Sequence, residues 1–177
     1  NIITIMNEAF SDLQVIGKFE TDKDYLSFEN SMKDDKNTIQ GNVYVSTIGT
    51  GTSNTEYEFL TGNSMAFLPI GSNAYTLYEK HTQPGFAMTL SDQNYSTTAF
   101  HPYYKENWNR VNTYQYMNFD RYIGMEDISN YQKLRNYISD EWDFQHIIDL
   151  YEKRDTSKPF FMFNVTMQNH SPYNTGL

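Results

Sequence analysis

The chain has 177 residues, 38% of them hydrophobic and 16% aromatic, a composition typical of a folded domain and not of a disordered segment. Its net charge of -9 argues against a nucleic-acid-binding protein, and the absence of cysteine excludes disulfides and cysteine-based zinc sites. A phosphate-bearing substrate is still compatible with this charge, because a bound metal ion reverses the sign of the charge around it.

The first part of the chain predicts two strands and two helices. A β-branched run at residues 2–6 predicts a buried strand, and the charged stretch from Leu13 to Lys36 predicts a short surface helix. Residues 42–46 predict a second strand. A glycine-rich turn at residues 49–52 follows, and the capping-box spacing of residues 53–56 predicts the start of a helix.

The second part of the chain continues the alternation. Helices are predicted at residues 84–94 and 107–117, and strands at residues 96–100 and 160–165. The clearest helix spans residues 139–154, with Ser139 as its cap, basic residues in its last turn, and a buried face formed by Phe144, Ile147, Ile148 and Tyr151. Alternating strands and helices predict an α/β fold with a mainly parallel sheet flanked by helices, which we treat as one unit.

Polar side chains follow the predicted strands. In parallel sheets, ligands bind beyond the carboxyl ends of the strands. This rule selects Glu8, Thr52, His101 and His170 as residues that meet at one edge. Taken singly, Glu8 is better explained as a solvated loop residue or a charge at a helix N-terminus, and Thr52 as part of a helix cap. A carboxylate and a hydroxyl at a helix N-terminus also suit a divalent metal and an activated nucleophile.

The histidines divide into two pairs. His81 and His146 are predicted to be solvated, whereas His101 and His170 each follow a strand. Arg110 adds a planar guanidinium that suits phosphoryl oxygens. Trp108 is explained as well by the core as by a binding pocket.

Four segments together resemble the extracytoplasmic catalytic domain of the lipoteichoic acid synthase family, phosphoglycerol transferases of the sulfatase and alkaline phosphatase superfamily. They are Asn7-Glu8-Ala9-Phe10, Gly51-Thr52-Ser53-Asn54-Thr55-Glu56, His101 with Trp108-Asn109-Arg110, and Thr166-Met167-Gln168-Asn169-His170. They occur in the family's order and span almost the whole chain. The resemblance therefore implies an alkaline-phosphatase-like fold, of which residues 1–177 are the N-terminal portion of one catalytic domain.

The resemblance also implies roles for individual residues. Glu8 matches a metal ligand, and Thr52 matches the nucleophile, which is itself a metal ligand and carries a covalent glycerol-phosphate intermediate. The residues that match the substrate-binding pocket are His101, Trp108, Arg110 and His170. The implied cofactor is one divalent ion, manganese or magnesium.

The same resemblance implies a cellular setting. The donor is a glycerophospholipid, the acceptor is a polyglycerol-phosphate chain, and the parent protein is anchored at the extracytoplasmic face of a bacterial membrane by segments outside this chain. The family's Asp-His metal pair lies downstream of Leu177. We therefore expect the chain alone to bind the ion weakly and to be inactive.

Two alternatives remain open from the sequence. A phosphodiesterase, phosphatase or sulfatase of the same superfamily would use water in place of the acceptor. A non-catalytic surface domain that binds glycans is suggested by the 15 Tyr and 12 Phe residues.

Overall fold

The computed structural model describes residues 1–47 and 51–174 and divides the chain into two regions, the main region of Asn1–Ala9 with Ser46–Leu177 and a second region of Phe10–Val45. Its helices and strands, in chain order, are β1 (Ile2–Met6), α1 (Ser27–Ser31), α2 (Thr52–Thr61), α3 (Ala74–Leu77), α4 (Phe86–Asp92), β2 (Ser96–Phe100), α5 (Arg110–Tyr116), β3 (Arg121–Ile123), β4 (Lys133–Leu134), β5 (Tyr137–Ile138), α6 (Asp140–Glu152) and β6 (Phe160–Val165).

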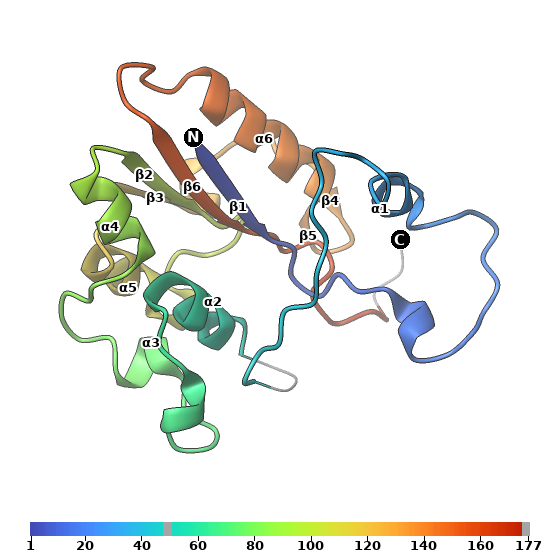
Figure 1. Ribbon diagram of the computed structural model, residues 1–177, viewed down its shortest axis with the longest axis horizontal. Coiled ribbons are helices and arrows are strands. Elements are labelled where there is room, and N and C mark those ends of the chain that lie inside the picture. Colours follow the sequence, from blue (N-terminus) through green and yellow to red (C-terminus); the bar gives the residue numbers. More distant parts are fainter. Residues whose placement is uncertain (48–50, 175–177) are drawn as a thin grey trace. The chain divides into compact units, whose positions relative to one another are not determined.

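The main region is built on a parallel sheet in the order β1-β6-β2-β3 (Figure 1). The last strand of the chain, β6, therefore lies between β1 and β2, and all six of its residues are buried. The apolar run at 160–165 reads as a strand covered on both faces because a central strand of a parallel sheet has helices on each side. The predicted α/β fold with a mainly parallel sheet is confirmed.

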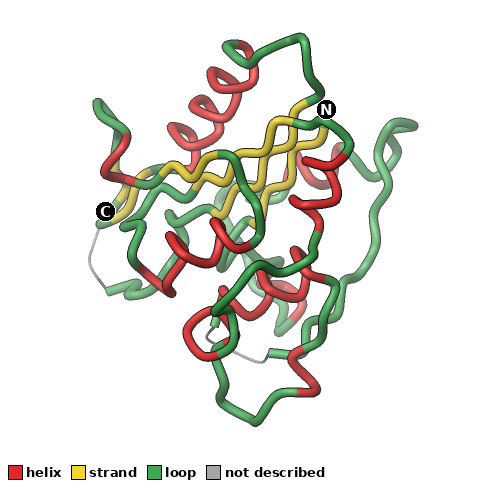
Figure 2. Tube along the Cα trace, turned by 90° about the vertical axis from the view of Figure 1, so that its left-hand side faces the viewer, coloured by secondary structure: helices red, strands yellow, loops and turns green. Residues whose placement is uncertain are grey.

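Each face of the sheet has its own hydrophobic core. Alternate residues of β6 point to opposite faces, so Phe161 and Phe163 pack with α2, α4 and α5, whereas Phe160 and Met162 pack with α6. Figure 2 shows the strands between α6 on one side and the other helices of the main region on the other. The sheet, including the carboxyl ends of its strands, is therefore packed against helices on both faces.

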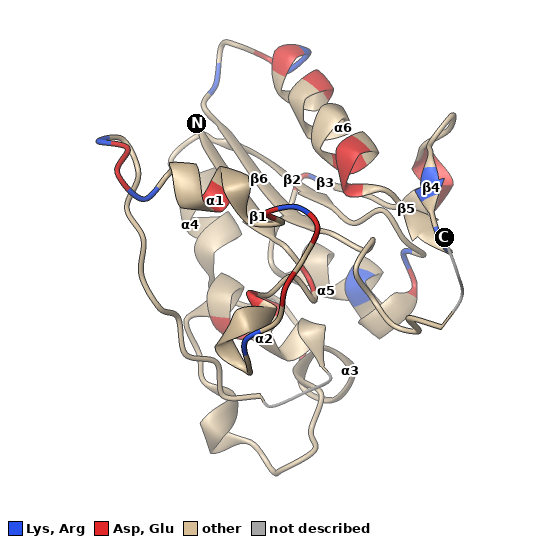
Figure 3. Cartoon of the chain, turned by 90° about the vertical axis from the view of Figure 1, so that its right-hand side faces the viewer, with Lys and Arg blue, Asp and Glu red and all other residues tan. Residues whose placement is uncertain are grey.

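Helix α6 confirms part of the prediction and corrects the rest. Ser139 caps it by accepting a hydrogen bond from Trp142, and acidic residues occupy its first turn, where they favour the helix dipole (Figure 3). The helix ends at Glu152, so no basic residue lies in its last turn. Ile148, predicted to be buried, is 49% exposed.

The buried face of α6 includes polar residues that an apolar periodicity does not reveal. Asp143 is fully buried and accepts a hydrogen bond from Asn164 on β6. His146, predicted to be solvated, instead stacks on Trp142 at a centroid distance of 4.8 Å and contacts Phe100. Burial lowers the pKa of His146 below its ordinary value.

Burial also raises the pKa of Asp143 to about 8, with the negative charge of Asp140 as the next cause. Because the folded state favours the protonated carboxyl, Asp143 contributes to the free energy of unfolding. This contribution is fully present below the ordinary Asp pKa and is lost as pH rises through about 8. We expect urea denaturation of the full-length protein to show an unfolding free energy that falls from pH 5 to pH 9, by ~1.4 kcal/mol per unit of pKa difference. Asp143→Asn removes the charge, so its curve should be flatter and should lie above the wild-type curve at the alkaline end. Parallel curves for the two proteins would contradict this assignment.

The strand predicted at residues 42–46 is wrong. These residues belong to no strand, and the side chains of Val43 and Tyr44 are 88% and 91% exposed. A β-branched and aromatic run suits a strand only where a neighbouring strand and a core are available to it. Of the turn predicted at 49–52, Gly49 and Thr50 lie outside the described residues.

The predicted capping box at residues 53–56 is also wrong, although the helix is present. Helix α2 begins at Thr52 after Gly51, which adopts a left-handed conformation (φ 104°), and no side chain caps it. Ser53 accepts a hydrogen bond from Asn73, and Glu56 is completely buried. The same spacing thus serves tertiary contacts and not a cap.

The other predicted elements are present, but β1 is an edge strand in which Ile3 and Ile5 are 41% and 42% exposed, so the burial predicted for residues 2–6 is wrong. Three strands were not predicted. The helices at 84–94 and 107–117 correspond to α4 and α5, and the second region contains α1 and a short 3-10 turn at Leu13–Val15. Strand β3 and the two-residue strands β4 and β5 are too short for an alternating pattern to appear in the sequence. Within residues 1–47 and 51–174, no helix has both the length and the apolar character needed to cross a membrane.

Candidate active site

The carboxyl end of the sheet opens into a pocket of about 370 Å³. It brings together the six residues selected from the sequence, which come from the segments after β1, β2 and β6, from the turn before α5, and from the first residues of α2 and α5. The structure thus places these six residues around one pocket, and the chemical roles assigned to them stay predictions. The residues that line the pocket are Glu8, Thr52, His101, Tyr103, Asn107, Trp108, Arg110, Tyr137, Met167 and His170.

Glu8 is placed by a contact between the ends of two neighbouring strands. Its backbone N–H donates to Oγ1 of Thr166 at 3.0 Å, and that hydroxyl donates to Asn7 at 3.1 Å. Thr166 itself is fully buried after β6. The carboxylate of Glu8 is mostly shielded, with its side chain 13% exposed. Its position is therefore fixed by the sheet and not by a solvated loop.

Thr52 faces Glu8 from the first residue of α2. Its hydroxyl donates a hydrogen bond of 2.6 Å to Oε1 of Glu8. Because the first N–H groups of a helix have no partners within the helix, the surroundings of this hydroxyl favour an anion. A hydroxyl that lies beside both a carboxylate and a helix N-terminus is suited to nucleophilic chemistry at phosphorus.

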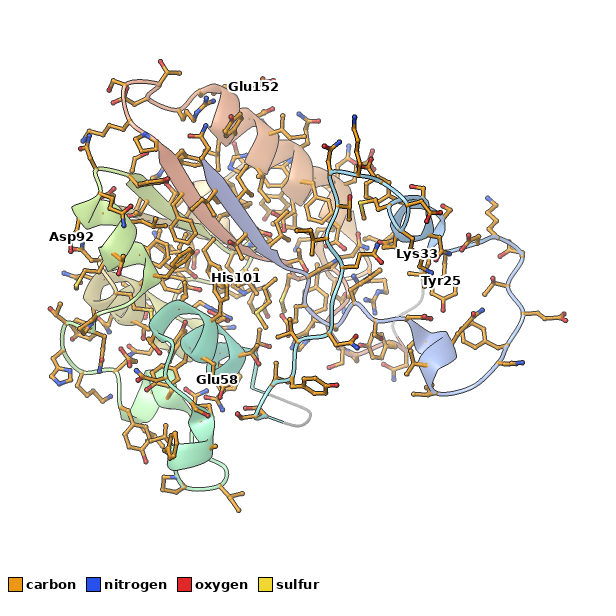
Figure 4. All side chains as sticks on the ribbon, in the orientation of Figure 1. Tyr25, Lys33, Glu58, Asp92, His101 and Glu152 are labelled. Carbon is orange, nitrogen blue, oxygen red and sulfur yellow. The ribbon has the colours of Figure 1, made fainter. Side chains whose placement is uncertain are left out.

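His101 is 2% exposed and lies directly after β2, inside the packed interior that surrounds its label in Figure 4. Its Nδ1 lies 2.8 Å from the carbonyl oxygen of Val165, which only accepts, so Nδ1 carries the proton. Burial, followed by the charge of Arg110, holds the pKa of His101 well below its ordinary value. The ring is therefore neutral, and its Nε2 is a hydrogen-bond acceptor.

Arg110 forms a buried ion pair with Glu56. Its Nε and Nη2 donate to the two carboxylate oxygens at 3.1 and 2.5 Å, and the hydroxyl of Tyr114 donates to the same carboxylate at 2.6 Å. Burial alone would lower the pKa of Arg110, but the charge of Glu56 outweighs it and leaves the pKa raised. The cation is permanent and fixed, and it also lines the pocket.

Trp108 lies in a turn whose backbone conformation is rare for residues other than glycine. Trp108 and Asn109 both adopt left-handed conformations, with φ values of 59° and 60°. Such conformations cost free energy for residues other than glycine, and they concentrate at functional sites. Asn109 tolerates this geometry best, and its amide donates to the carbonyl of Tyr75 at 3.1 Å. This turn leaves Trp108 42% exposed at the rim of the pocket.

His170 completes the site on the side of β6. Its Nε2 lies 3.9 Å from Oε1 of Glu8, and its Nδ1 lies 2.7 Å from the carbonyl oxygen of Ser171. The ring also packs edge-to-face on Tyr137 at a centroid distance of 5.7 Å. The side chain is 42% exposed and so remains accessible from the pocket.

The donor atoms fit part of a site for a hard divalent cation. Glu8 and Thr52 present two oxygens 2.6 Å apart, the ligand type that magnesium and manganese prefer. Among residues 1–47 and 51–174, no group of three or more His, Cys, Asp or Glu side chains is arranged to hold a metal ion. A complete coordination shell would therefore need additional ligands.

Several pocket residues were not selected from the sequence. Glu56 was interpreted as a helix cap, yet it fixes Arg110, and Asn107, Tyr103, Tyr137 and Met167 line the pocket. Asn107 is next to Trp108 in the sequence, and Tyr103 is two residues after His101. Closeness in sequence to a selected residue could therefore have identified both of them. Tyr137 lies on the two-residue strand β5, which no sequence pattern marks.

Two sequence relatives match nearly the whole chain. A protein of Rhizobium meliloti (strain 1021) named "Putative cyclic beta-1,2-glucan modification protein" is 33% identical over 98% of the chain. The lipoteichoic acid synthase of Staphylococcus saprophyticus is 28% identical, also over 98%. The chain spans only about a quarter of these relatives, 26% and 27% of their lengths.

Solved structures have the same fold. The phosphoglycerol transferase GacH of Streptococcus pyogenes, in complex with sn-glycerol-1-phosphate, matches 98% of this chain and 45% of its own, with a TM-score of 0.82 and 22% identity. An alkaline phosphatase superfamily protein of Vibrio parahaemolyticus matches 67% of this chain and 29% of its own, with a TM-score of 0.57 and 24% identity. The sequence family described as Sulfatase matches residues 1–176. The chain therefore belongs to the sulfatase family and resembles its lipoteichoic acid synthase-like members, as its motifs indicated.

Proposed function

We propose that the chain is the N-terminal portion of a metal-dependent phosphoglycerol transferase that uses Thr52 as its nucleophile. The donor is the head group of a glycerophospholipid, and the acceptor is a hydroxyl of lipoteichoic acid or a related cell-envelope polymer. The observation that carries the proposal is the 2.6 Å hydrogen bond from Thr52 to Glu8. This bond lies at a helix N-terminus, inside a pocket that the positively charged side chain of Arg110 also lines. The family and its lipoteichoic acid synthase relative support the same reaction class.

In the first half of the reaction, Oγ1 of Thr52 forms a bond to the phosphorus of the donor, and the bond from phosphorus to diacylglycerol breaks. Thr52 gives up its hydroxyl proton, diacylglycerol leaves as the alcohol after gaining one proton in its place, and glycerol phosphate remains on Thr52. In the second half, the oxygen of an acceptor hydroxyl forms the bond to phosphorus, the bond to Thr52 breaks, and the threonine hydroxyl recovers a proton. Glu8 orients Oγ1 by accepting its hydrogen bond.

The remaining pocket residues divide by charge. Arg110 carries a permanent positive charge, and the N-terminus of α2 carries a partial one, so together they stabilise the phosphate oxygens as negative charge develops. His170 approaches the same oxygens from the side of Glu8. His101 is neutral with Nε2 as an acceptor, which suits a hydroxyl of the glycerol group better than a phosphate oxygen.

Glu8 and Thr52 would hold a manganese or magnesium ion together with ligands from outside the described residues. When bound, such an ion lowers the pKa of a coordinated hydroxyl and balances negative charge on the phosphate. The parent protein would act at the extracytoplasmic face of a bacterial membrane, where its lipid donor is found.

The covalent step gives the direct test. Full-length protein that is incubated with head-group-labelled phosphatidylglycerol and then denatured should retain the label, and peptide mapping should place it on Thr52. A label on another residue, or a covalent label that persists in Thr52→Ala, would refute the proposed nucleophile.

The products separate the proposed transferase from its alternatives. Label that passes to a polymer indicates a transferase, and free glycerol phosphate without polymer extension indicates a phosphodiesterase of the same superfamily. Glycan binding that is unaffected by Thr52→Ala, with no turnover of any phosphate or sulfate ester, indicates a non-catalytic domain.

A further inference from the structure

We propose that three tyrosines beside the active-site pocket form a subsite for a neutral sugar unit of the acceptor. They are Tyr103, Tyr104 and Tyr137. The inference rests on the proposed function and deepens it, because it names a glycan and not a polyglycerol-phosphate chain as the acceptor. Its basis is the way in which two pockets share the same aromatic side chains.

The second pocket has a volume of about 280 Å³ and adjoins the first. Tyr103 and Tyr137 line both pockets, so the two pockets adjoin at these side chains. The residues that line this second pocket are Pro102, Tyr103, Tyr104, Met125, Lys133, Asn136, Tyr137 and Ile138. In the proposed arrangement a sugar rests in this second pocket and directs a hydroxyl past the shared tyrosines toward Thr52.

The aromatic rings form an unbroken series that starts at the catalytic pocket. His170 contacts Tyr137 at a centroid distance of 5.7 Å, Tyr137 contacts Tyr103 at 5.9 Å, and Tyr103 contacts Tyr104 at 5.0 Å. All three contacts are edge-to-face, which leaves ring faces at different orientations. Tyr104 ends the series and is 50% exposed.

The tyrosines are held in place before any ligand binds. The backbone of Tyr103 donates to His101 at 2.7 Å and accepts from Met125 at 2.9 Å. The hydroxyl of Tyr137 donates to the carbonyl oxygen of Ser171 at 2.6 Å. Arg135, in the turn between β4 and β5, donates to the carbonyl oxygen of Gln168 at 2.7 Å. A rigid subsite loses little conformational entropy when it binds a ligand.

The chemistry of this lining selects a sugar over the other acceptor classes. A pyranose ring presents C–H groups on its faces and hydroxyls around its edge, which complement tyrosine faces, phenol hydroxyls and the amide of Asn136. A polyglycerol-phosphate chain is a polyanion, but Lys133 is the one cation among the residues that line this pocket. An acyl chain would leave these polar groups without partners.

Tyr104 allows a test that leaves the catalytic pocket intact, because it lines the second pocket and not the first. The full-length protein would be given head-group-labelled phosphatidylglycerol, first with water alone and then with a β-1,2-linked gluco-oligosaccharide as acceptor. We expect transfer to the oligosaccharide. Tyr104→Ala should raise the KM for it about tenfold, the effect of losing one stacking contact. Hydrolysis without acceptor should remain within about twofold of wild type.

Two further variants serve as controls. Tyr104→Phe keeps the aromatic face and should retain a KM close to that of wild type. Tyr78→Ala removes a tyrosine that is 39% exposed and lines neither pocket, and it should change nothing.

The failures are distinguishable. The inference is overturned if wild type extends polyglycerol phosphate but not the oligosaccharide, if Tyr104→Ala leaves the KM unchanged, or if it lowers hydrolysis and transfer equally. If labelled glycerol phosphate is released to neither water nor any acceptor, the proposed function itself fails.

Discussion

Thr52→Ala should reduce turnover of the full-length protein to background and leave its fold intact. The substitution removes the atom that would carry the glycerol-phosphate group, so no binding contact compensates for it. The loss should appear in kcat, with little change in KM, because the remaining pocket residues still bind the donor. Steady-state assays with phosphatidylglycerol give both constants, and circular dichroism checks the fold.

Thr52→Ser is the matched control. Serine keeps the hydroxyl that donates to Glu8 and loses only the methyl group, so part of the activity should remain. If Thr52→Ala retains near-normal turnover, the residue serves only as the first residue of α2, and the mechanism proposed above is wrong.

Arg110→Met should lower the unfolding free energy by ~3–5 kcal/mol, the usual cost of leaving one member of a buried ion pair without its partner. Glu56 is completely buried and would keep only the hydroxyl of Tyr114 as a donor among the described residues. The double variant Glu56→Gln with Arg110→Met removes both charges and should recover much of the loss. Urea denaturation of the full-length protein measures these differences.

An exposed pair provides the comparison. Lys105 and Asp127 form an ion pair at 2.8 Å with side chains 27% and 37% exposed, so Lys105→Met should cost less than ~1 kcal/mol. If Arg110→Met proves no more costly than Lys105→Met, the buried pair does not contribute to stability in the way described.

Local sequence patterns were sufficient for β1, β2 and β6 of the main sheet and for its longer helices. The run at 160–163 is apolar at successive positions because β6 is covered on both faces, and Ser139 marks the start of α6 by its capping chemistry. The site residues could be selected because the ends of parallel strands meet at one edge. That rule succeeded for Glu8, His101 and His170.

Thr52 was selected by a step that proved wrong. The strand assumed before it does not exist, and Thr52 reaches the site because α2 packs on the sheet with its N-terminus at the same edge. Glu56 was misinterpreted because capping-box spacing is identical whether the glutamate turns back to its own helix or pairs with an arginine 54 residues away. Contacts of that length leave no local pattern in the sequence.

The hydrogen bond from Glu8 to Thr166 joins residues 158 positions apart. At a synthesis rate of ~5–20 residues per second, about 8 to 30 s pass between the emergence of the two residues from the ribosome. Among the described strands, β1 pairs with β6 alone, so it has no partner during this interval. The carboxylate beside Thr52 thus takes its place only when β6 has paired with β1. A translating chain would therefore gain the hydroxyl of Thr52 early and the carboxylate that orients it late, so the proposed nucleophile would be held inactive until β6 is in place.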